Sequence, residues 1–257
     1  MRYGILTAAL ALGGACALGA AVLVTADAGD PGKASAAPAA TYSTGPKEKN
    51  VKPVAKGSDR AKAATKQSKD ALAEAGLTIP EGWHPAQIRS ERHEDRPVTV
   101  VRYEQDTTRD LGGEHITTVV DDEGTLYGYT RMTVAGAEKP VPADDKARET
   151  AFDWLRGFAP EHADGLSVQW VDQHDEEVRD KAGAAHTVSG AKVKTHHENG
   201  LYTWMIVDGD GDIVTYERDV RWDGAANRRA TQMWLHDKWI AAREGSGPQP
   251  PSPYAQS

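Results

Sequence analysis

The stretch HITTVVDDEGTLYGYTR, from His115 to Arg131, decides the fold, because its pattern returns 87 residues later as YTWMIVDGDGDIVTYER, from Tyr202 to Arg218. Five positions are identical in the two copies: Val120/Val207, Asp121/Asp208, Gly124/Gly211, Tyr129/Tyr216 and Arg131/Arg218. A pattern that recurs in this way indicates one supersecondary unit used twice. We therefore predict two related units in one chain.

Each copy predicts a β-hairpin. Asp121 and Asp208 can accept hydrogen bonds from their own turn, and the glycine three residues later tolerates a positive φ because it has no Cβ. The flanking segments are rich in β-branched and aromatic residues, as strands are. Tyr129 and Tyr216 lie on the outgoing strands, where we expect each ring to cover the sheet beside a solvated arginine. Both tyrosines are also candidate binding residues.

A helical pattern precedes each hairpin. Ser58 can cap a first helix that runs to Gly76, and since its apolar stripe is mostly alanine we expect it to dock loosely or fray. Asp144 or Asp145 can cap a second helix, which ends at Pro160. The stripe of the second helix consists of Ala151, Trp154, Leu155 and Phe158. A helix followed by three or four antiparallel strands, twice, predicts an α+β fold with helices on one face of a sheet.

The ordered part divides into residues 58–140, the first α+β repeat, and residues 141–245, the second repeat with a closing helix over about 228–243. Residues 29–57 and 246–257 are poor in hydrophobic side chains and rich in proline or glycine. Such composition is typical of disorder. We predict a disordered N-terminal linker and a disordered C-terminal tail.

Residues 1–28 predict a signal peptide or a membrane anchor. Arg2 precedes an apolar run from Ile5 to Val24, and the Ala26-Asp27-Ala28 site suits signal peptidase. The run of about 20 residues is also long enough to span a bilayer, so cleavage and retention both stay open. The protein is expected to be extracytoplasmic, secreted or anchored to the membrane by this segment. The exported part has no cysteine, since Cys16 is the only one.

The charge distribution excludes nucleic acid as a partner. Residues 27–70 carry a net charge of +4, whereas residues 71–257 carry −13. An acidic body is repelled by a phosphate backbone. The basic leader could lie along an anionic membrane or wall surface, although a solvated linker is the more economical interpretation.

The acidic cluster Asp208, Asp210 and Asp212 resembles the start of a calcium loop. Ile213 stands where that loop needs glycine, and Asp219 stands where it needs a bidentate glutamate. A solvated hairpin turn explains the acids better. The three aspartates remain only a weak alternative for a metal site.

The nine histidines suggest a second alternative, a metal-dependent envelope hydrolase that uses the region from His174 to His197, with His186 and His196 between them. Against it, His196 and His197 are adjacent and would point to opposite faces of a strand. The sequence also has no His-Glu-x-x-His, no Gly-x-Ser-x-Gly and no glycine-rich phosphate loop. We therefore predict a protein without catalytic residues or cofactor. A purely structural envelope protein is a third possibility.

Seven of the 17 aromatic residues are tryptophans, and only two are phenylalanines. Most of the tryptophans are expected in the core. Trp83, in a proline-flanked loop, and Trp222, next to a turn, are the predicted exposed pair that could line a groove for peptide or glycan.

One strand reads Thr-x-Val-Val-Asp-Asp-Glu-Gly-x-Leu-x-x-Tyr, and it precedes a helix that reads Ala-Asp-Asp-Lys-Ala-Arg-Glu-Thr-Ala-Phe-Asp-Trp-Leu. Over about residues 58–220 this arrangement resembles the PepSY domain and the repeated domains of bacterial spore-cortex and YcdB-type proteins. The resemblance implies extracytoplasmic α+β modules, often in tandem, that regulate or inhibit peptidases. That family defines no catalytic residues, and no peptidase is attached here. We expect an exported, non-enzymatic module that binds a protein or cell-envelope partner.

Overall fold

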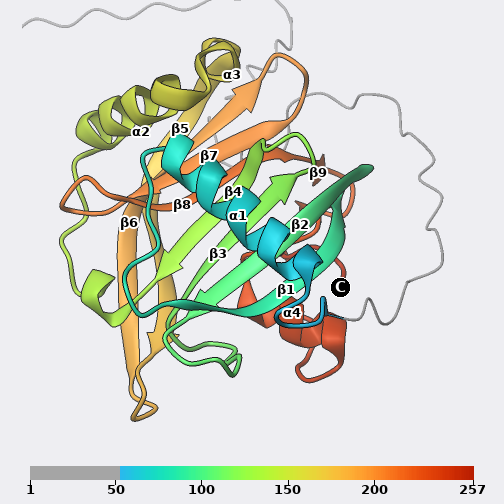
Figure 1. The fold of residues 1–257 in the computed structure, drawn as a ribbon. Coiled ribbons are helices and arrows are strands. Elements are labelled where there is room, and N and C mark those ends of the chain that lie inside the picture. Colours follow the sequence, from blue (N-terminus) through green and yellow to red (C-terminus); the bar gives the residue numbers. More distant parts are fainter. Residues whose placement is uncertain (1–52) are drawn as a thin grey trace, which may run out of the picture. The chain divides into compact units, whose positions relative to one another are not determined.

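A computed structural model describes residues 53–257 (Figure 1). Eight antiparallel strands form one sheet in the order β1-β2-β3-β4-β8-β7-β6-β5. The strands are β1 (His84–His93), β2 (Arg96–Glu104), β3 (His115–Asp121), β4 (Leu126–Met132), β5 (Leu166–Arg179), β6 (Ala185–His197), β7 (Tyr202–Val207) and β8 (Ile213–Val220). The α+β class is therefore confirmed.

The signal peptide or anchor and nearly all of the predicted linker lie outside the described residues. Within residues 53–257, no helix is both long and apolar enough to cross a membrane.

Two strands from opposite halves of the chain meet at the centre of the sheet. β4 pairs with β8 through Gly128 and Glu217, Tyr129 and Tyr216, and Thr130 and Thr215. Tyr129 and Tyr216 hold the same position in the two copies of the sequence pattern, so each copy is paired with its own counterpart. This is the register expected of an approximate two-fold axis that passes between the two tyrosines.

The two hairpin turns are built alike. Asp121 Oδ1 accepts hydrogen bonds from the N–H groups of Glu123 and Thr125 at 3.0 and 2.9 Å. Asp208 Oδ1 accepts from the second and fourth residues after it, both at 3.0 Å. Gly124 and Gly211 have φ angles of +91° and +86°, a region that favours glycine. The predicted hairpins are thus confirmed, and Val120 and Val207 both lie on the strand that enters the turn, directly before its aspartate.

Helices α1 (Asp59–Glu74) and α2 (Asp144–Phe158) lie on the same face of the sheet, and α2 is followed by the short α3 (Pro160–Asp164) and preceded by the 3-10 turn η2 (Val134–Gly136). As predicted, Ser58 caps α1, with its Oγ 3.1 Å from the N–H of Ala61. The N-cap of α2 is Ala143, so Asp144 and Asp145 lie in the first turn instead, where they favour the positive end of the helix dipole.

The expectation that α1 docks loosely is wrong. Its Ser68 is buried and hydrogen-bonds Thr118 Oγ1 at 2.7 Å, and Tyr103 Oη donates to Ser68 Oγ at 2.9 Å. A stripe of alanines does not reveal these polar anchors, because they depend on side chains of β2 and β3.

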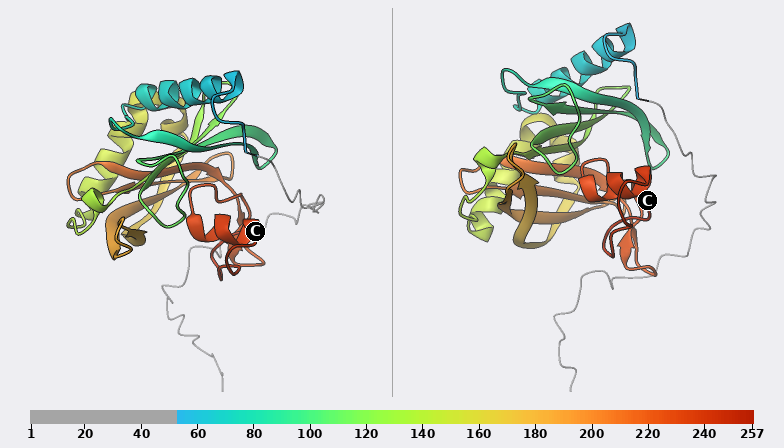
Figure 2. Two further views of the ribbon diagram at one scale, coloured as in Figure 1. Left: turned by 60° about the horizontal axis from the view of Figure 1, so that its bottom comes forward. Right: turned by 90° about the horizontal axis from the view of Figure 1, so that it is seen from below.

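The opposite face of the sheet is covered by the C-terminal segment, residues 221–257, with β9 (Trp222–Asp223), β10 (Arg228–Arg229) and α4 (Asp237–Glu244) (Figure 2). The predicted closing helix over 228–243 is thus shorter than expected. The predicted disorder of 246–257 is also wrong: Ala255 is 1% exposed, and the Pro253 carbonyl accepts from the N–H of Arg229 at 3.0 Å. Contacts with Met233 and the sheet order this proline-rich tail.

Candidate functional site

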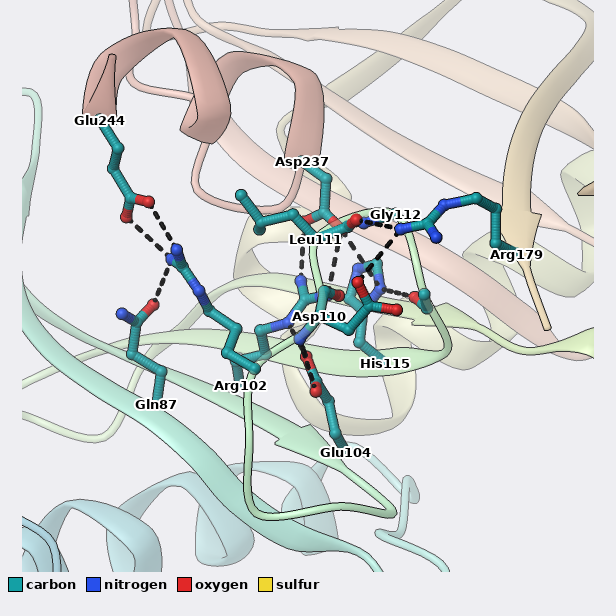
Figure 3. Close-up of polar contacts among 12 residues, drawn as sticks. Gln87, Arg102, Glu104, Asp110, Leu111, Gly112, His115, Arg179, Asp237 and Glu244 are labelled. Carbon is teal, nitrogen blue, oxygen red and sulfur yellow. Dashed lines mark hydrogen bonds and ion pairs between the residues drawn. The ribbon is translucent and has the colours of Figure 1, made fainter. Parts of the chain in front are cut away.

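A layer of charged side chains lies between the sheet and the C-terminal segment (Figure 3). Arg102, on β2, donates from Nη1 and Nη2 to the two carboxylate oxygens of Asp237 at 2.7 and 3.0 Å, and from Nε to Glu104. The three side chains are 4%, 13% and 5% exposed. This is a bidentate, shielded ion pair that fixes the start of α4 on the first half of the sheet.

The loop after β2 completes this cluster. Gly112 N–H donates to Asp237 Oδ2 at 2.5 Å, and Glu104 accepts from the N–H of Asp110 at 2.9 Å. His115 Nδ1 lies 2.9 Å from the Gly113 carbonyl. Burial, together with the neighbouring Arg102, lowers the pKa of His115, so its imidazole is neutral at neutral pH. Burial also raises the pKa of Glu104, against the lowering effect of Arg102.

A second buried cluster centres on Glu217 of β8. Its carboxylate forms an ion pair with Arg229 Nη1 at 2.5 Å and accepts hydrogen bonds from His236 Nε2 and Trp204 Nε1, both at 3.0 Å. Burial alone would raise the pKa of Glu217, but the charges of Arg229 and His236 hold it well below its usual range. The other nitrogen of His236 lies 3.6 Å from Glu176 on β5. This second cluster ties the C-terminal segment to the other half of the sheet.

The carboxylates of both clusters have cationic or N–H partners. Lys192 is a neighbour of the second cluster: its Nζ lies 4.2 Å from the centre of the Trp204 ring, and burial lowers its pKa to about 8.

A groove of about 750 Å³ opens between α1 and β1, where the segment 53–57 passes. Apolar side chains form its floor: Pro53, Val54, Ala61, Pro85, Ala86 and Ile88. Four lysines stand around it: Lys56, Lys62, Lys66 and Lys69. Its volume falls in the range of small-ligand sites. We call this space the α1 groove.

On α2 an aromatic side chain stands where α1 has a lysine. When the two helices are aligned on their buried stripes, Ala64-Ser68-Leu72 and Ala147-Ala151-Leu155, Lys69 corresponds to Phe152. Phe152 is partly buried and packs against the core below the helices. Lys62 and Lys66 correspond to Asp145 and Glu149, so the charge along this row of the helix is reversed.

Tyr129 and Tyr216, proposed as candidate binding residues, are both buried. They are 1% and 0% exposed at the centre of the sheet, and burial raises the pKa of Tyr129 to about 12. Trp154 and Phe158 close over Tyr216 at ring distances of 5.1 and 6.0 Å. The alternation of the strand turns these rings toward the helices, which cover them.

Trp83 and Trp222, the predicted exposed pair, are each partly buried and lie against different layers. Trp83 packs on the core under the helices. Trp222 belongs to the C-terminal segment, on the other face, and its ring centre lies 5.0 Å from Lys194 Nζ. The two tryptophans therefore do not line one groove.

The acids of the second turn are engaged by cationic side chains. Lys139 Nζ lies 2.8 Å from both Asp208 Oδ2 and Asp210 Oδ2, and Arg131 donates to Asp212 at 2.9 Å. Asp208 is fully buried. Over residues 53–257, no group of three or more His, Cys, Asp or Glu side chains is arranged to hold a metal ion.

The four histidines of the hydrolase alternative do not converge. His174 pairs with Glu176 and His186 with Asp180, both at 3.1 Å. His196 and His197 contact different rings instead, Tyr202 at 4.9 Å and His162 at 4.8 Å. These four histidines of the β5–β6 hairpin therefore contact four different residues.

The α1 groove was missed from the sequence. A usable signal was present, because Lys62, Lys66 and Lys69 recur at i, i+4 and i+7 and so share one face of α1. The charge pattern of residues 27–70 includes these lysines but does not show that they border a groove. Searches of family models, curated proteins and solved structures returned no match to this chain.

Proposed function

We propose that this protein is an exported, non-enzymatic binding module of two tandem PepSY-like units, secreted or held at the membrane by its N-terminal segment. It binds a protein or cell-envelope partner in the α1 groove. Regulation of a peptidase is the role that the resemblance implies.

The tandem arrangement is supported by the order of the elements. A helix followed by four antiparallel strands occurs twice, and the two sets join through equivalent residues of β4 and β8. One sheet built from two copies buries the central edges that each unit would otherwise expose.

The observation that carries the binding role is the α1 groove itself. It is an apolar hollow ringed by lysines, and Phe152 stands on α2 at the position that Lys69 holds on α1. Close packing is the rule in folded proteins, so a space kept open on one half of a duplicated fold is a candidate for a ligand.

A photoreactive amino acid at Thr65, which lines the groove, tests the proposal. The full chain carrying it is expressed in its own cells and irradiated, with the same residue placed at Arg148, the matching position on α2, as the control. An adduct that forms at 65 and not at 148 is expected. Equal labelling at both positions would contradict a groove-bound partner, and no adduct at all would favour a purely structural envelope protein.

A further inference from the structure

Three polar groups that line the α1 groove already have partners within the fold. The Ile88 carbonyl accepts from the N–H of Val54 at 2.9 Å, Thr65 Oγ1 donates to the Ala61 carbonyl at 2.8 Å, and Gln87 Oε1 accepts from Arg109 at 3.0 Å. An extended peptide needs partners for its backbone N–H and C=O groups when it loses water. An alkyl chain needs no such partners, and it matches the apolar side chains that line the groove.

The lysines at the rim of the α1 groove favour an anionic ligand. Lys62 and Lys66 make only local pairs, with Asp59 at 3.2 Å and Asp70 at 2.5 Å, and their side chains are 71% and 77% exposed. Exposed pairs of this kind contribute little free energy, so both ammonium groups can turn to a ligand. Lys69 stands at the same rim. In a body that is strongly acidic, this concentration of positive charge attracts an anion.

We infer that the α1 groove binds a single-chain anionic amphiphile, a long-chain fatty acid, with its alkyl chain on the Ala61, Ala86 and Ile88 floor and its carboxylate among Lys62, Lys66 and Lys69. This inference rests on the proposed function, because it names the envelope partner that occupies the groove. A long aliphatic stem lets each lysine cover the chain and still reach the headgroup.

The test uses cis-parinaric acid, whose fluorescence rises in an apolar site, titrated into the full chain. Saturable binding is expected, with displacement by oleate and weak binding of the uncharged methyl ester. Thr65→Trp fills the groove and should abolish saturable binding of cis-parinaric acid and of its methyl ester. Arg148→Trp, the matching change on α2, should leave it unchanged. The apolar segment Ile5 to Val24 is the same in all variants, so differences report the groove.

A charge-reversed variant, Lys66→Glu with Lys69→Glu, guards against loss of folding in Thr65→Trp, since the Lys66 side chain is largely exposed. It should weaken parinarate roughly tenfold, from lost and reversed surface pairs, and leave the ester unaffected. Lys146→Glu on α2 is its control. Binding that is absent in the natural chain, or that survives both groove variants, overturns the inference.

The photoreactive experiment distinguishes failure of the fatty acid inference from failure of the proposed binding function. An adduct at position 65 that oleate does not compete, together with no parinarate binding, would keep the binding module and overturn the fatty acid. Loss of the adduct in the presence of oleate is expected if the inference holds.

Discussion

Helices α1 and α2 lie on the same face of one sheet, α1 against β1, β2 and β3 and α2 against β5, β6 and β7, and they differ in how they fill the space beside them. The buried stripes of the two helices consist of similar small and aliphatic residues: Ala64, Ser68 and Leu72 on α1, and Ala147, Ala151 and Leu155 on α2. The rows of side chains on either side of each stripe differ between the two helices. α2 brings Trp154, Phe158 and Phe152, where α1 brings Ala71, Ala75 and Lys69. The comparison teaches that the two helices share a buried stripe that builds the sheet–helix core, whereas the flanking rows differ in size and charge.

A second difference lies on the opposite face. The C-terminal segment covers β2 and β3 with an apolar cluster around Trp234 and Trp239, and it reaches the other half through Glu217 and Glu176. The duplicated pattern has no counterpart of this segment. The C-terminal segment therefore makes the two halves of the sheet different, because one segment covers this face with both apolar and charged side chains.

The largest effect is expected from Arg102→Met. It leaves the buried carboxylates of Asp237 and Glu104 without their cation, so we expect a loss of about 3 to 5 kcal/mol in the free energy of unfolding. Urea denaturation followed by tryptophan fluorescence measures it. Arg92→Met, at a side chain that is 57% exposed, should change stability by less than about 0.5 kcal/mol. A similar small loss for Arg102→Met would show that the C-terminal segment is not clamped by this pair.

Trp154→Ala should cost about 2 to 4 kcal/mol, because it opens a cavity beside Tyr216 and removes the 2.7 Å hydrogen bond from Nε1 to the Ala75 carbonyl. Thermal unfolding by circular dichroism measures the loss. Trp154→Phe keeps an aromatic ring and loses the hydrogen bond, so it should cost about 1 kcal/mol. If both variants match the natural chain, α2 does not depend on its aromatic row, and the contrast with α1 fails.

The two turns make a matched pair. Asp208→Ala should cost about 2 kcal/mol and Asp121→Ala about 1 kcal/mol. Both lose two turn hydrogen bonds, but Asp208 is also 2.8 Å from the largely buried Lys139, whereas Asp121 faces Arg96 at 3.4 Å, whose side chain is 46% exposed. Parallel urea titrations of the two variants compare them. The reverse order would mean that the ion pairs behind the second turn are not stabilising.

A pH dependence of stability is expected from Lys192. Its pKa of about 8 lies below the ordinary value of 10.5, so between those values the unfolded chain binds more protons than the folded one. Stability of the natural chain relative to Lys192→Met should therefore rise from about pH 8 to pH 10.5 and be flat below pH 8. Denaturation at several pH values measures this difference. Lys181→Met, at a side chain that is 65% exposed, should show no such slope, and equal slopes would contradict the burial of Lys192.

Local sequence was enough to predict the hairpins, the Ser58 cap and the two helices, since each depends on residues within a few positions of one another. The Asp-x-x-Gly turns are the clearest case, because the side chain and the N–H groups that it accepts from lie within four residues. Candidate binding residues were predicted less well. Tyr129 and Tyr216 each share a strand face with an arginine, which made them candidates. Alternation along a strand does not say which face a helix will cover.

The sequence by itself determined the duplication, the α+β class and the position of both turns. Repeated patterns and short-range hydrogen bonds depend on residues that are close together in the sequence. Only the tertiary structure decided that the proline-rich tail packs on the sheet, that Arg102 meets Asp237 across 135 residues, and that a groove opens beside α1. Those features depend on which side chains meet after the strands have paired and on how much space they leave. Volume and charge partners of that kind are set by long-range contacts, which no local pattern encodes.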